Sequence, residues 1–324
     1  MGLHVASDVR QPGHFGFQPV GGLVTADGTS QWDPVSGIPM SMQYAYGTLR
    51  GVNSRRYFWP IRGSFRTEAR RMHLSVADVG EDFSWASEGE EAYVGPVVHE
   101  ERDGWMGTWI GDDILYATNG PEFQWKEGDF LDVRGELVGD ALQFLVPDEV
   151  ESLVYTSRVF RAAGTVLGED VTGLFFHDSM HMPENRNFIR SSYITDLQAA
   201  WVAFATEFED GNIHAGHLVW GTQGFDLMII ERTDGPPIVA HDLDVDVVIE
   251  DDYPVEVVYR GRGETWVWTA HGACFRDPIR ADLPEGHRRI QGWARRSDET
   301  RTPIMTEALM ETYNGRLADV LRGD

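Results

Sequence analysis

A short polar motif near the middle of the chain holds the side chains best suited to chemistry. It reads His177-Asp178-Ser179-Met180-His181 and directly follows an apolar run that ends in Phe176. In an extended strand His177 and His181 share one face, whereas Asp178 points to the other face. An imidazole titrates near neutral pH, and burial can raise the pKa of a carboxyl group into the same range. The motif therefore predicts general acid–base chemistry by His177 and Asp178 beside an apolar cavity.

The same motif allows a structural alternative. Polar side chains at a junction between two domains can hydrogen-bond to one another and fill the space without touching a substrate. Replacing a member of such a plug would lower any activity only in proportion to lost folding. Acid–base catalysis and a polar plug therefore stay open as two hypotheses for His177 and Asp178.

A second candidate carboxylate lies in a strand with regular alternation, Glu264–His271. Glu264, Trp266 and Trp268 share one face of this strand. A carboxylate beside two indoles fits a pocket wall, where its pKa would be raised, and it fits an external row of Trp with Glu in solvent equally well. Glu264 is thus the next catalytic candidate. The residues expected to bind substrate are His181, Phe176, Trp201, Trp266 and Tyr193.

Motifs for metals and common cofactors are absent from the sequence. His214 and His217 lie three residues apart, so on a strand they face opposite ways, and no His or Cys set has the spacing of a metal site. No glycine-rich phosphate loop and no G-x-S-x-G nucleophile motif occurs. We therefore predict no metal and no organic cofactor.

Composition and charge limit the class of protein and its partners. The chain has 324 residues, 42% of them apolar, and a net charge of -25. This length allows two cores, and the charge would repel nucleic acid and anionic membranes. No apolar run approaches the roughly 20 residues of a membrane-spanning helix. The single Cys274 excludes an internal disulfide and suits a reducing cytosol, so we expect a cytoplasmic protein without nucleic-acid partners.

Short strands recur between turn signals along almost the whole chain. Asp103-Gly104 and Asp210-Gly211 are strong hairpin dipeptides, and Val138-Gly139-Asp140 predicts another hairpin. No segments of helical period alternate with these strands, so we expect an all-β fold of antiparallel barrels. The predicted domains are residues 1–160, which begin with an extended arm, and residues 161–324.

Two segments support more specific structural predictions. Residues 164–168 and 171–176 are expected to form a hairpin at the midpoint, with Glu169 and Asp170 in the turn. Residues 302–313 offer a Thr N-cap, a following Pro and apolar residues at helical spacing. They predict a short C-terminal helix that closes an open barrel end.

The midpoint hairpin and the motif that follows it resemble a known family. GTVLGEDVTGLFFHDSMHMP, the later strand WVAFATEFEDG and Gly261-Arg262-Gly263-Glu264 are similar to elements of the AttH and carotenoid 1,2-hydratase (hydroxyneurosporene synthase) group. That group's motif more often reads D-H-S-W-G-x-R, whereas here His177 precedes Asp178. The resemblance implies two lipocalin-like barrels. It also implies a cofactor-free reaction on a lipophilic molecule, such as addition or removal of water, isomerisation or cyclisation.

Two functions from different classes are consistent with these observations. The first is a cofactor-independent lyase, hydratase or isomerase that acts on a small hydrophobic substrate (terpenoid, steroid or aromatic) by acid–base chemistry. The second is a non-catalytic carrier of a lipophilic molecule, which would not need several titratable groups in an apolar cavity. The directions in which His177 and Asp178 point are therefore the observation that separates the two.

Overall fold

The computed structural model describes residues 20–24, 39–79, 84–87, 92–146, 152–251, 253–271, 287–313 and 316–317. Strand accounts for 70% of the structure and helix for 5%, all sheet pairing is antiparallel, and the sheets form one nearly closed barrel and one half-barrel. The predicted all-β class with two lipocalin-like barrels is confirmed. Cys274 and most of the expected N-terminal arm lie outside the described residues.

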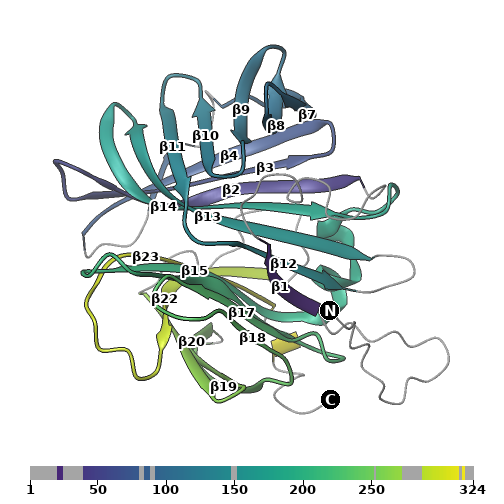
Figure 1. Cartoon of the computed structure of the whole chain (residues 1–324), viewed down its shortest axis with the longest axis vertical. Helices are drawn as coiled ribbons and strands as arrows, with labels where there is room; N and C mark the ends of the chain where they lie inside the picture. The colour runs from purple at the N-terminus through teal and green to yellow at the C-terminus, as the bar shows by residue number, and fades with distance from the viewer. Residues whose placement is uncertain are drawn as a thin grey trace. The chain divides into compact units, whose positions relative to one another are not determined.

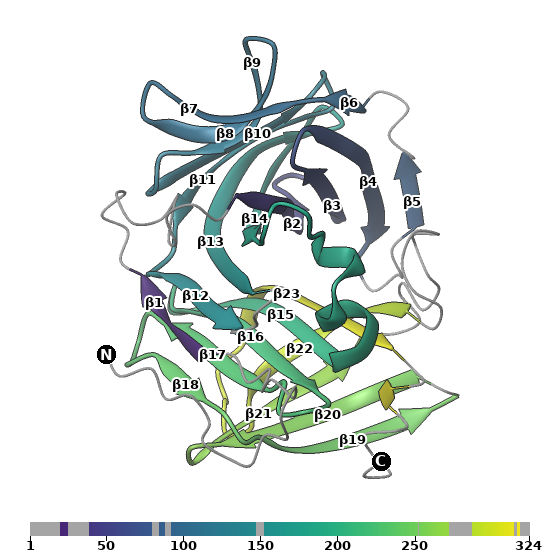
Figure 2. The same ribbon diagram turned by 90° about the vertical axis from the view of Figure 1, so that its right-hand side faces the viewer.

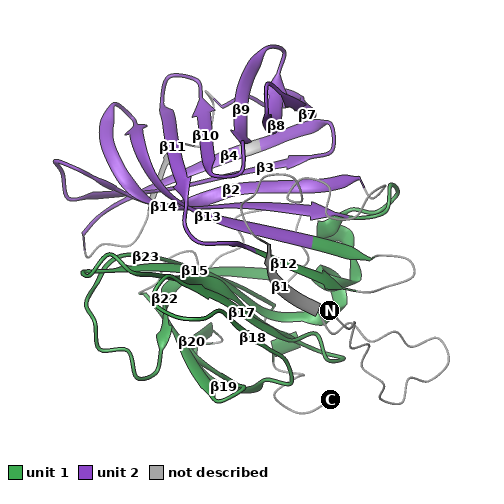
Figure 3. Cartoon of the chain, in the orientation of Figure 1, with its two compact units in different colours: residues 1–23, 142–154, 182–324 green, residues 24–141, 155–181 purple. Residues whose placement is uncertain are grey.

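The chain divides into two compact units, shown in different colours in Figure 3. Unit 1 comprises residues 1–23, 142–154 and 182–324, and unit 2 comprises residues 24–141 and 155–181. The midpoint strand that carries His177 thus belongs to the unit built from the N-terminal half. Residue 160, where the predicted domains meet, lies inside a strand; the domain boundary itself stays a prediction.

Unit 2 is built on a long antiparallel sheet that curves around an apolar interior (Figure 2). Along the sheet the strands follow the order β5 (Ser84–Ser87), β4 (Glu68–Asp78), β3 (Arg56–Phe65), β2 (Met40–Gly51), β14 (Glu169–His181), β13 (Leu153–Val166), β11 (Leu131–Leu137), β10 (Glu122–Glu127), β9 (Asp113–Thr118), β8 (Trp105–Ile110) and β7 (Val98–Arg102). The two-residue strand β6 (Gly95–Pro96) pairs with β4. Side chains alternate between the two faces: in β11, Leu131 and Val133 are buried, whereas Asp132 and Arg134 are exposed.

Unit 1 contains a nine-stranded antiparallel sheet with its own core (Figure 1). Its order is β18 (Ile238–Ala240), β17 (Leu227–Arg232), β16 (Ile213–Gly221), β15 (Gln198–Phe208), β23 (Pro303–Tyr313), β22 (His287–Arg296), β21 (Glu264–Ala270), β20 (Tyr253–Gly261) and β19 (Asp244–Glu250). A 3-10 turn, η1 (Phe188–Arg190), and a π-helical turn, η2 (Tyr193–Leu197), precede β15. Strands β1 (Val20–Val24) and β12 (Ala141–Val146) pair with each other.

The turn dipeptides behave largely as predicted. Asp103-Gly104 joins β7 to β8 with both residues at positive φ, and Asp210-Gly211 joins β15 to β16. The midpoint hairpin is also present, as β13 and β14. Its turn, however, is Leu167-Gly168, with φ of 49° and 77°, so Glu169 and Asp170 belong to β14 instead. A two-residue turn with both φ positive matches the twist of the flanking strands.

Two predicted elements are wrong. Val138-Gly139-Asp140 does not close a hairpin, because β11 pairs with β10 and β13 while β12 pairs with β1 and β13. Residues 303–313 form strand β23 instead of the predicted helix, and this strand pairs with β15 on one side and β22 on the other. The apolar residues of this segment are spaced as in a helix, but the hydrogen bonds that the strand forms along both edges decide its structure. Residues 316–317 are helical.

Candidate active site

His177 points into the interior of unit 2. It follows Phe175 on the same face of β14, and Phe175 belongs to the core of that unit. The imidazole is 1% exposed, and its ring centroid lies 5.4 Å from that of Phe123 and 5.7 Å from that of Tyr116. Both ring nitrogens are buried, and neither has a hydrogen-bond partner among the described residues. Because buried polar atoms are usually paired, this imidazole is a candidate to bind a ligand.

The turn at Leu167-Gly168 sets the register that brings Arg158 to His177. Val166 faces Glu169 across the two-residue turn, so a regular ladder places Arg158 opposite His177. Arg158 is fully buried. Burial, together with the charges of Arg158 and His99, lowers the pKa of His177 to about 3. The imidazole is therefore neutral at physiological pH, with one nitrogen that donates and one that accepts.

His99 on β7 is the second histidine of this interior. Its Nδ1 lies 2.8 Å from Thr108 Oγ1, and the Thr108 hydroxyl donates to Gln43 Oε1 at 3.0 Å. A hydroxyl has one proton, so His99 Nδ1–H is the donor to Thr108 Oγ1 and His99 Nε2 carries the lone pair. That Nε2 is buried without a partner among the described residues, and burial lowers the pKa of His99 to about 4. The Thr108 hydroxyl thus fixes a tautomer with a free acceptor.

Tyr116 completes the polar part of the interior. Its hydroxyl hydrogen-bonds to the Ser64 hydroxyl, so β9 is linked to β3. Burial raises the pKa of Tyr116 to about 12, against the opposing effects of its hydrogen bonds to Ser64 and Thr108. The phenol therefore keeps its proton. The ring stands edge-on to His177 and helps to hold the imidazole in place.

Asp178 faces away from this interior, as the alternation of a strand requires. Its Oδ2 accepts hydrogen bonds from the Tyr46 hydroxyl at 2.9 Å and from the Tyr155 hydroxyl. Burial raises the pKa of Asp178 to about 6, while Ser157, the two tyrosines and Arg158 oppose the rise. Asp178 is therefore a buried carboxylate held by phenols. The groups that shift the pKa of His177 do not include it.

A fully buried ion pair accounts for the other charges inside unit 2. The Arg62 guanidinium binds the Glu127 carboxylate through two nitrogens, one of them Nε at 2.6 Å from Oε1. Trp125 Nε1 donates to the same carboxylate at 2.8 Å. Both charges are thus compensated, so we assign this ion pair a structural role.

The other predicted site residues are dispersed. Phe176 stacks on Tyr46 with ring centroids 5.2 Å apart, on the Asp178 face, and His181 is the buried last residue of β14. Glu264 lies in unit 1, partly exposed next to the Arg262-Gly263 turn. The structure thus brings neither His177 nor Asp178 together with Glu264 within one unit.

Three of the predicted aromatic residues, Trp266, Trp201 and Tyr193, also lie in unit 1. Trp266 is in the core of that unit, with its ring centroid 5.2 Å from that of Phe204, so it does not belong to an external row of Trp side chains. Trp201 donates its Nε1–H to His217 Nδ1 at 3.1 Å. Tyr193 stacks on Phe225 with centroids 5.9 Å apart. These three residues have structural partners of their own.

Three residues of the unit 2 interior were missed by sequence analysis: His99, Tyr116 and Arg158. Arg158 has a readable signal, because it is the one charged residue in the strand-like segment from Leu153 to Phe160. His99 and Tyr116 have none, since each lies in a short strand that pairs with its neighbours in the sequence, and the local pattern does not show that these residues meet His177. The predicted side-chain directions of His177 and Asp178, toward opposite faces, are confirmed.

The described residues offer no evident metal site. They contain no group of three or more His, Cys, Asp or Glu side chains arranged to hold a metal ion. His214 and His217 face opposite sides of β16: His214 lies against Trp266 and His217 against Trp201. In the part of the chain that the structure describes, no helix is long and apolar enough to cross a membrane.

Comparison with known proteins finds likeness only among solved structures. Neither a protein-family model nor a curated protein sequence matches the chain. A candidate AttH from Nitrosomonas europaea is similar, with 13% identity, a TM-score of 0.49, and coverage of 86% of this chain and 94% of the other. The second, kievitone hydratase from Nectria haematococca, has 9% identity, a TM-score of 0.49, and coverage of 90% and 93%. The structural neighbours thus include the AttH type that the resemblance in the sequence predicted, and the side chains alone support the chemistry below.

Proposed function

We propose that unit 2 holds a small, mostly apolar molecule with an oxygen function and moves a proton to or from it. The reaction would be that of a hydratase, dehydratase or isomerase without an organic cofactor. The observation that supports this most directly is a pair of imidazoles, His177 and the partly buried His99, which together leave three buried ring nitrogens unpartnered among the described residues. A purely structural plug would satisfy these atoms.

The two histidines suit different roles. His99 Nε2 has a lone pair fixed by the hydrogen bond through Thr108, so it is the proton acceptor. His177 is neutral and can donate its N–H to a substrate oxygen, as a neutral imidazole does where the imidazolium is disfavoured. Arg158 supplies a fixed positive charge beside it, which would stabilise negative charge that develops on that oxygen.

Asp178 acts as a positioning residue in this proposal. It lies on the opposite face of β14 and is bound by Tyr46 and Tyr155, which come from β2 and β13. The carboxylate therefore fixes three adjacent strands and provides a counter-charge to Arg158. Burial lowers the pKa of Arg158 to about 10 despite this counter-charge, so the guanidinium stays protonated at neutral pH.

A non-catalytic carrier is the second candidate, and one observation favours it. With pKa values near 3 and 4, His177 and His99 are weak proton acceptors in the free protein. Neutral imidazoles of this kind are sufficient to hydrogen-bond a ligand without reacting with it. The enzyme and the carrier would therefore both bind the ligand, but only the enzyme would convert it.

The test combines binding with product analysis. The protein is screened by thermal shift against small hydrophobic alcohols, enones and phenols, since a ligand that binds only the native state raises Tm. Each hit is then incubated with the protein and followed by mass spectrometry for gain or loss of one water, and by chromatography for an isomer. An enzyme converts a hit, whereas a carrier returns every hit unchanged.

Variants identify the groups involved. His177→Phe and His99→Phe should each lower turnover by about 10²- to 10⁴-fold, the usual contribution of a positioned acid or base. His241→Phe, in unit 1, is the matched control and should turn over normally. Normal turnover in both interior variants would exclude the acid–base assignment, and losses that follow the folded fraction would favour the polar plug.

A further inference from the structure

Strands β22 and β23 of unit 1 are paired along only part of their length. Their ladder runs from His287–Tyr313 to Gln291–Leu309. Beyond that point β22 stays paired with β21 as far as Arg296, while β23 stays paired with β15 as far as Pro303. The two strands therefore separate before the loop that joins them.

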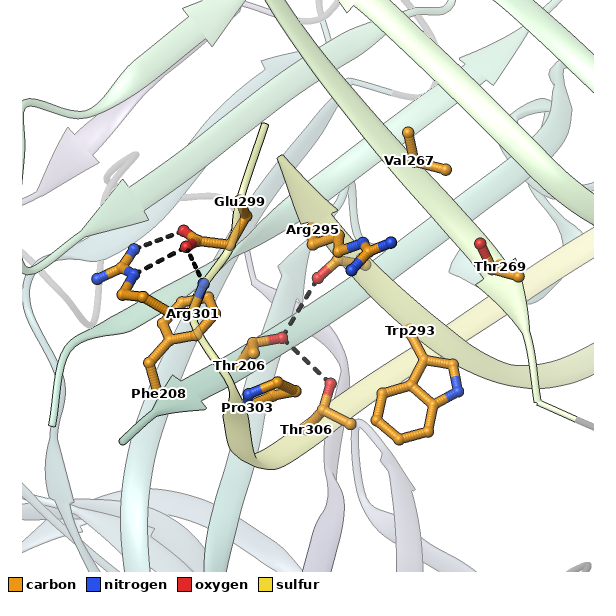
Figure 4. A pocket seen from close by; sticks show the side chains of 11 residues that line it. Thr206, Phe208, Val267, Thr269, Trp293, Arg295, Glu299, Arg301, Pro303 and Thr306 are labelled. Carbon is orange, nitrogen blue, oxygen red and sulfur yellow. Dashed lines mark hydrogen bonds and ion pairs between the residues drawn. The ribbon is translucent and has the colours of Figure 1, made fainter. Parts of the chain in front are cut away.

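A cavity of about 270 Å³ lies where the strands separate (Figure 4). Thr206 on β15 bridges part of the gap, because its hydroxyl donates to Ala294 O at 3.3 Å and lies 3.1 Å from the Thr306 hydroxyl. The remaining space is lined by side chains from all four strands. It includes none of the residues that form the unit 2 interior.

One wall of the cavity combines an apolar surface with a positive charge. Trp293 and Arg295 lie two apart on β22, so they share a face, and they pair with Thr269 and Val267 of β21. Trp293 is 42% exposed, a high value for a side chain of this size. Figure 4 shows both side chains on the cavity wall.

The two arginines of the cavity differ in their partners. Arg301 binds the Glu299 carboxylate through two nitrogens, at 2.9 and 2.6 Å, and also contacts Asp210 and Asp234. Its charge is therefore compensated. Arg295 forms no ion pair with any described residue, in a chain of net charge -25. An exposed guanidinium beside an indole, on the wall of a cavity, is complementary to a ligand with an anionic end and an apolar body.

We propose that this cavity is a second ligand site, which binds a small amphiphilic carboxylate through Arg295 and Trp293. The carboxylate accepts hydrogen bonds from the Arg295 guanidinium, and the apolar part packs on the Trp293 indole and Val267. The cavity volume of about 270 Å³ is below the range of drug-sized pockets, which begins at roughly 300 Å³, so the ligand is small. The site is independent of the chemistry proposed for unit 2.

Phenylacetate and phenylacetamide are matched probes for this proposal, because they have the same size and ring and differ in charge. Calorimetric titration of the full chain should show phenylacetate binding at least about tenfold more tightly, the value of one charge-assisted hydrogen bond at a partly exposed site. Arg295→Gln should abolish this preference. Trp293→Ala should weaken both probes.

Arg134→Gln is the matched control, since Arg134 is an exposed arginine on β11 of unit 2 and its loss changes the net charge equally. It should leave the preference for phenylacetate intact. Equal affinity for the two probes, equal loss in the Arg134 variant, or no binding of phenylacetate at millimolar concentration would each overturn the proposal. Circular dichroism of each variant confirms that the fold is retained.

Discussion

The Thr108 hydroxyl determines which ring nitrogen of His99 carries the proton. It accepts from His99 Nδ1 and donates to Gln43, so its removal frees the imidazole to change tautomer. Thr108→Val should therefore lower turnover of an identified substrate by about 10- to 100-fold, less than loss of His99 itself. Thr108→Ser keeps the hydroxyl and should restore most of the activity. Nitrogen chemical shifts of His99 should report the tautomer change; an unchanged tautomer in the valine variant would contradict the assignment.

The carboxylate of Asp178 depends on its two phenols. Because burial raises its pKa, its ionised form costs stability, and the hydroxyls of Tyr46 and Tyr155 reduce that cost. Tyr46→Phe or Tyr155→Phe should raise the pKa further and lower the free energy of unfolding by about 1–3 kcal/mol at pH 8. Below the pKa of about 6 the carboxyl group is protonated, so the loss should be smaller at pH 5. Urea unfolding at both pH values checks this, and an equal loss at both would contradict it.

At the scale of elements, the β13–β14 turn determines which residues meet. A turn at Glu169-Asp170, as predicted from the sequence, would have placed Arg158 opposite His181. The observed turn at Leu167-Gly168 places it opposite His177. The sequence was sufficient to predict this hairpin, most other strands and the Asp-Gly turns. It was insufficient for the register, because Leu is an unusual residue at a positive-φ turn position.

That turn offers a test of stability. Leu167 is 40% exposed at a φ of 49°, where a branched apolar residue is strained and Asn is tolerated. Leu167→Asn should therefore raise the free energy of unfolding by about 0.5–1 kcal/mol. Gly168→Ala, at a φ of 77°, should lower it by about 1 kcal/mol or more. Thermal unfolding of the two variants measures both changes, and a destabilised Asn variant would exclude this turn geometry.

The site shows most clearly where sequence analysis reached its limit. The sequence was sufficient to place His177 and Asp178 on opposite faces of one strand, because local alternation determines those faces. His99, Tyr116 and Thr108 reach the same interior through the pairing of β7, β8 and β9. The predicted C-terminal helix failed for another reason: β23 is held by β15, about a hundred residues earlier, and by its neighbour β22. Long-range pairing leaves little local signal.

At the scale of the whole molecule, buried neutral histidines make stability depend on pH. Burial lowers the pKa of both His177 and His217 to about 3, whereas the unfolded value is 6.5. The unfolded chain thus binds more protons between these values, so stability is fully present above about pH 6.5 and falls as the pH decreases. Between these two pKa values, each histidine should lower the free energy of unfolding by about 1.4 kcal/mol for each unit by which the pH falls.

Urea titrations between pH 7 and pH 5 measure this slope. His177→Phe should reduce it by about one histidine's share, because one proton fewer is taken up on unfolding. Asp178 has the opposite sign: its raised pKa of about 6 favours the folded state as the pH falls below that value. Asp178 therefore offsets part of the histidine slope below about pH 6, and a slope unchanged in the His177 variant would contradict the burial of a neutral imidazole.

The pairing of β14 with β2 also has a consequence during synthesis. The hydrogen bond from Tyr46 to Asp178 joins residues 132 positions apart, and β2 pairs with β14 along almost its whole length. Strand β2 therefore leaves the ribosome long before its partner does, and one of its edges stays open until residue 181 has been translated. Such distant pairing closes slowly, and an unpaired strand edge is a template for association with other chains. The nascent protein is thus expected to need a chaperone at the stage when unit 2 is half made.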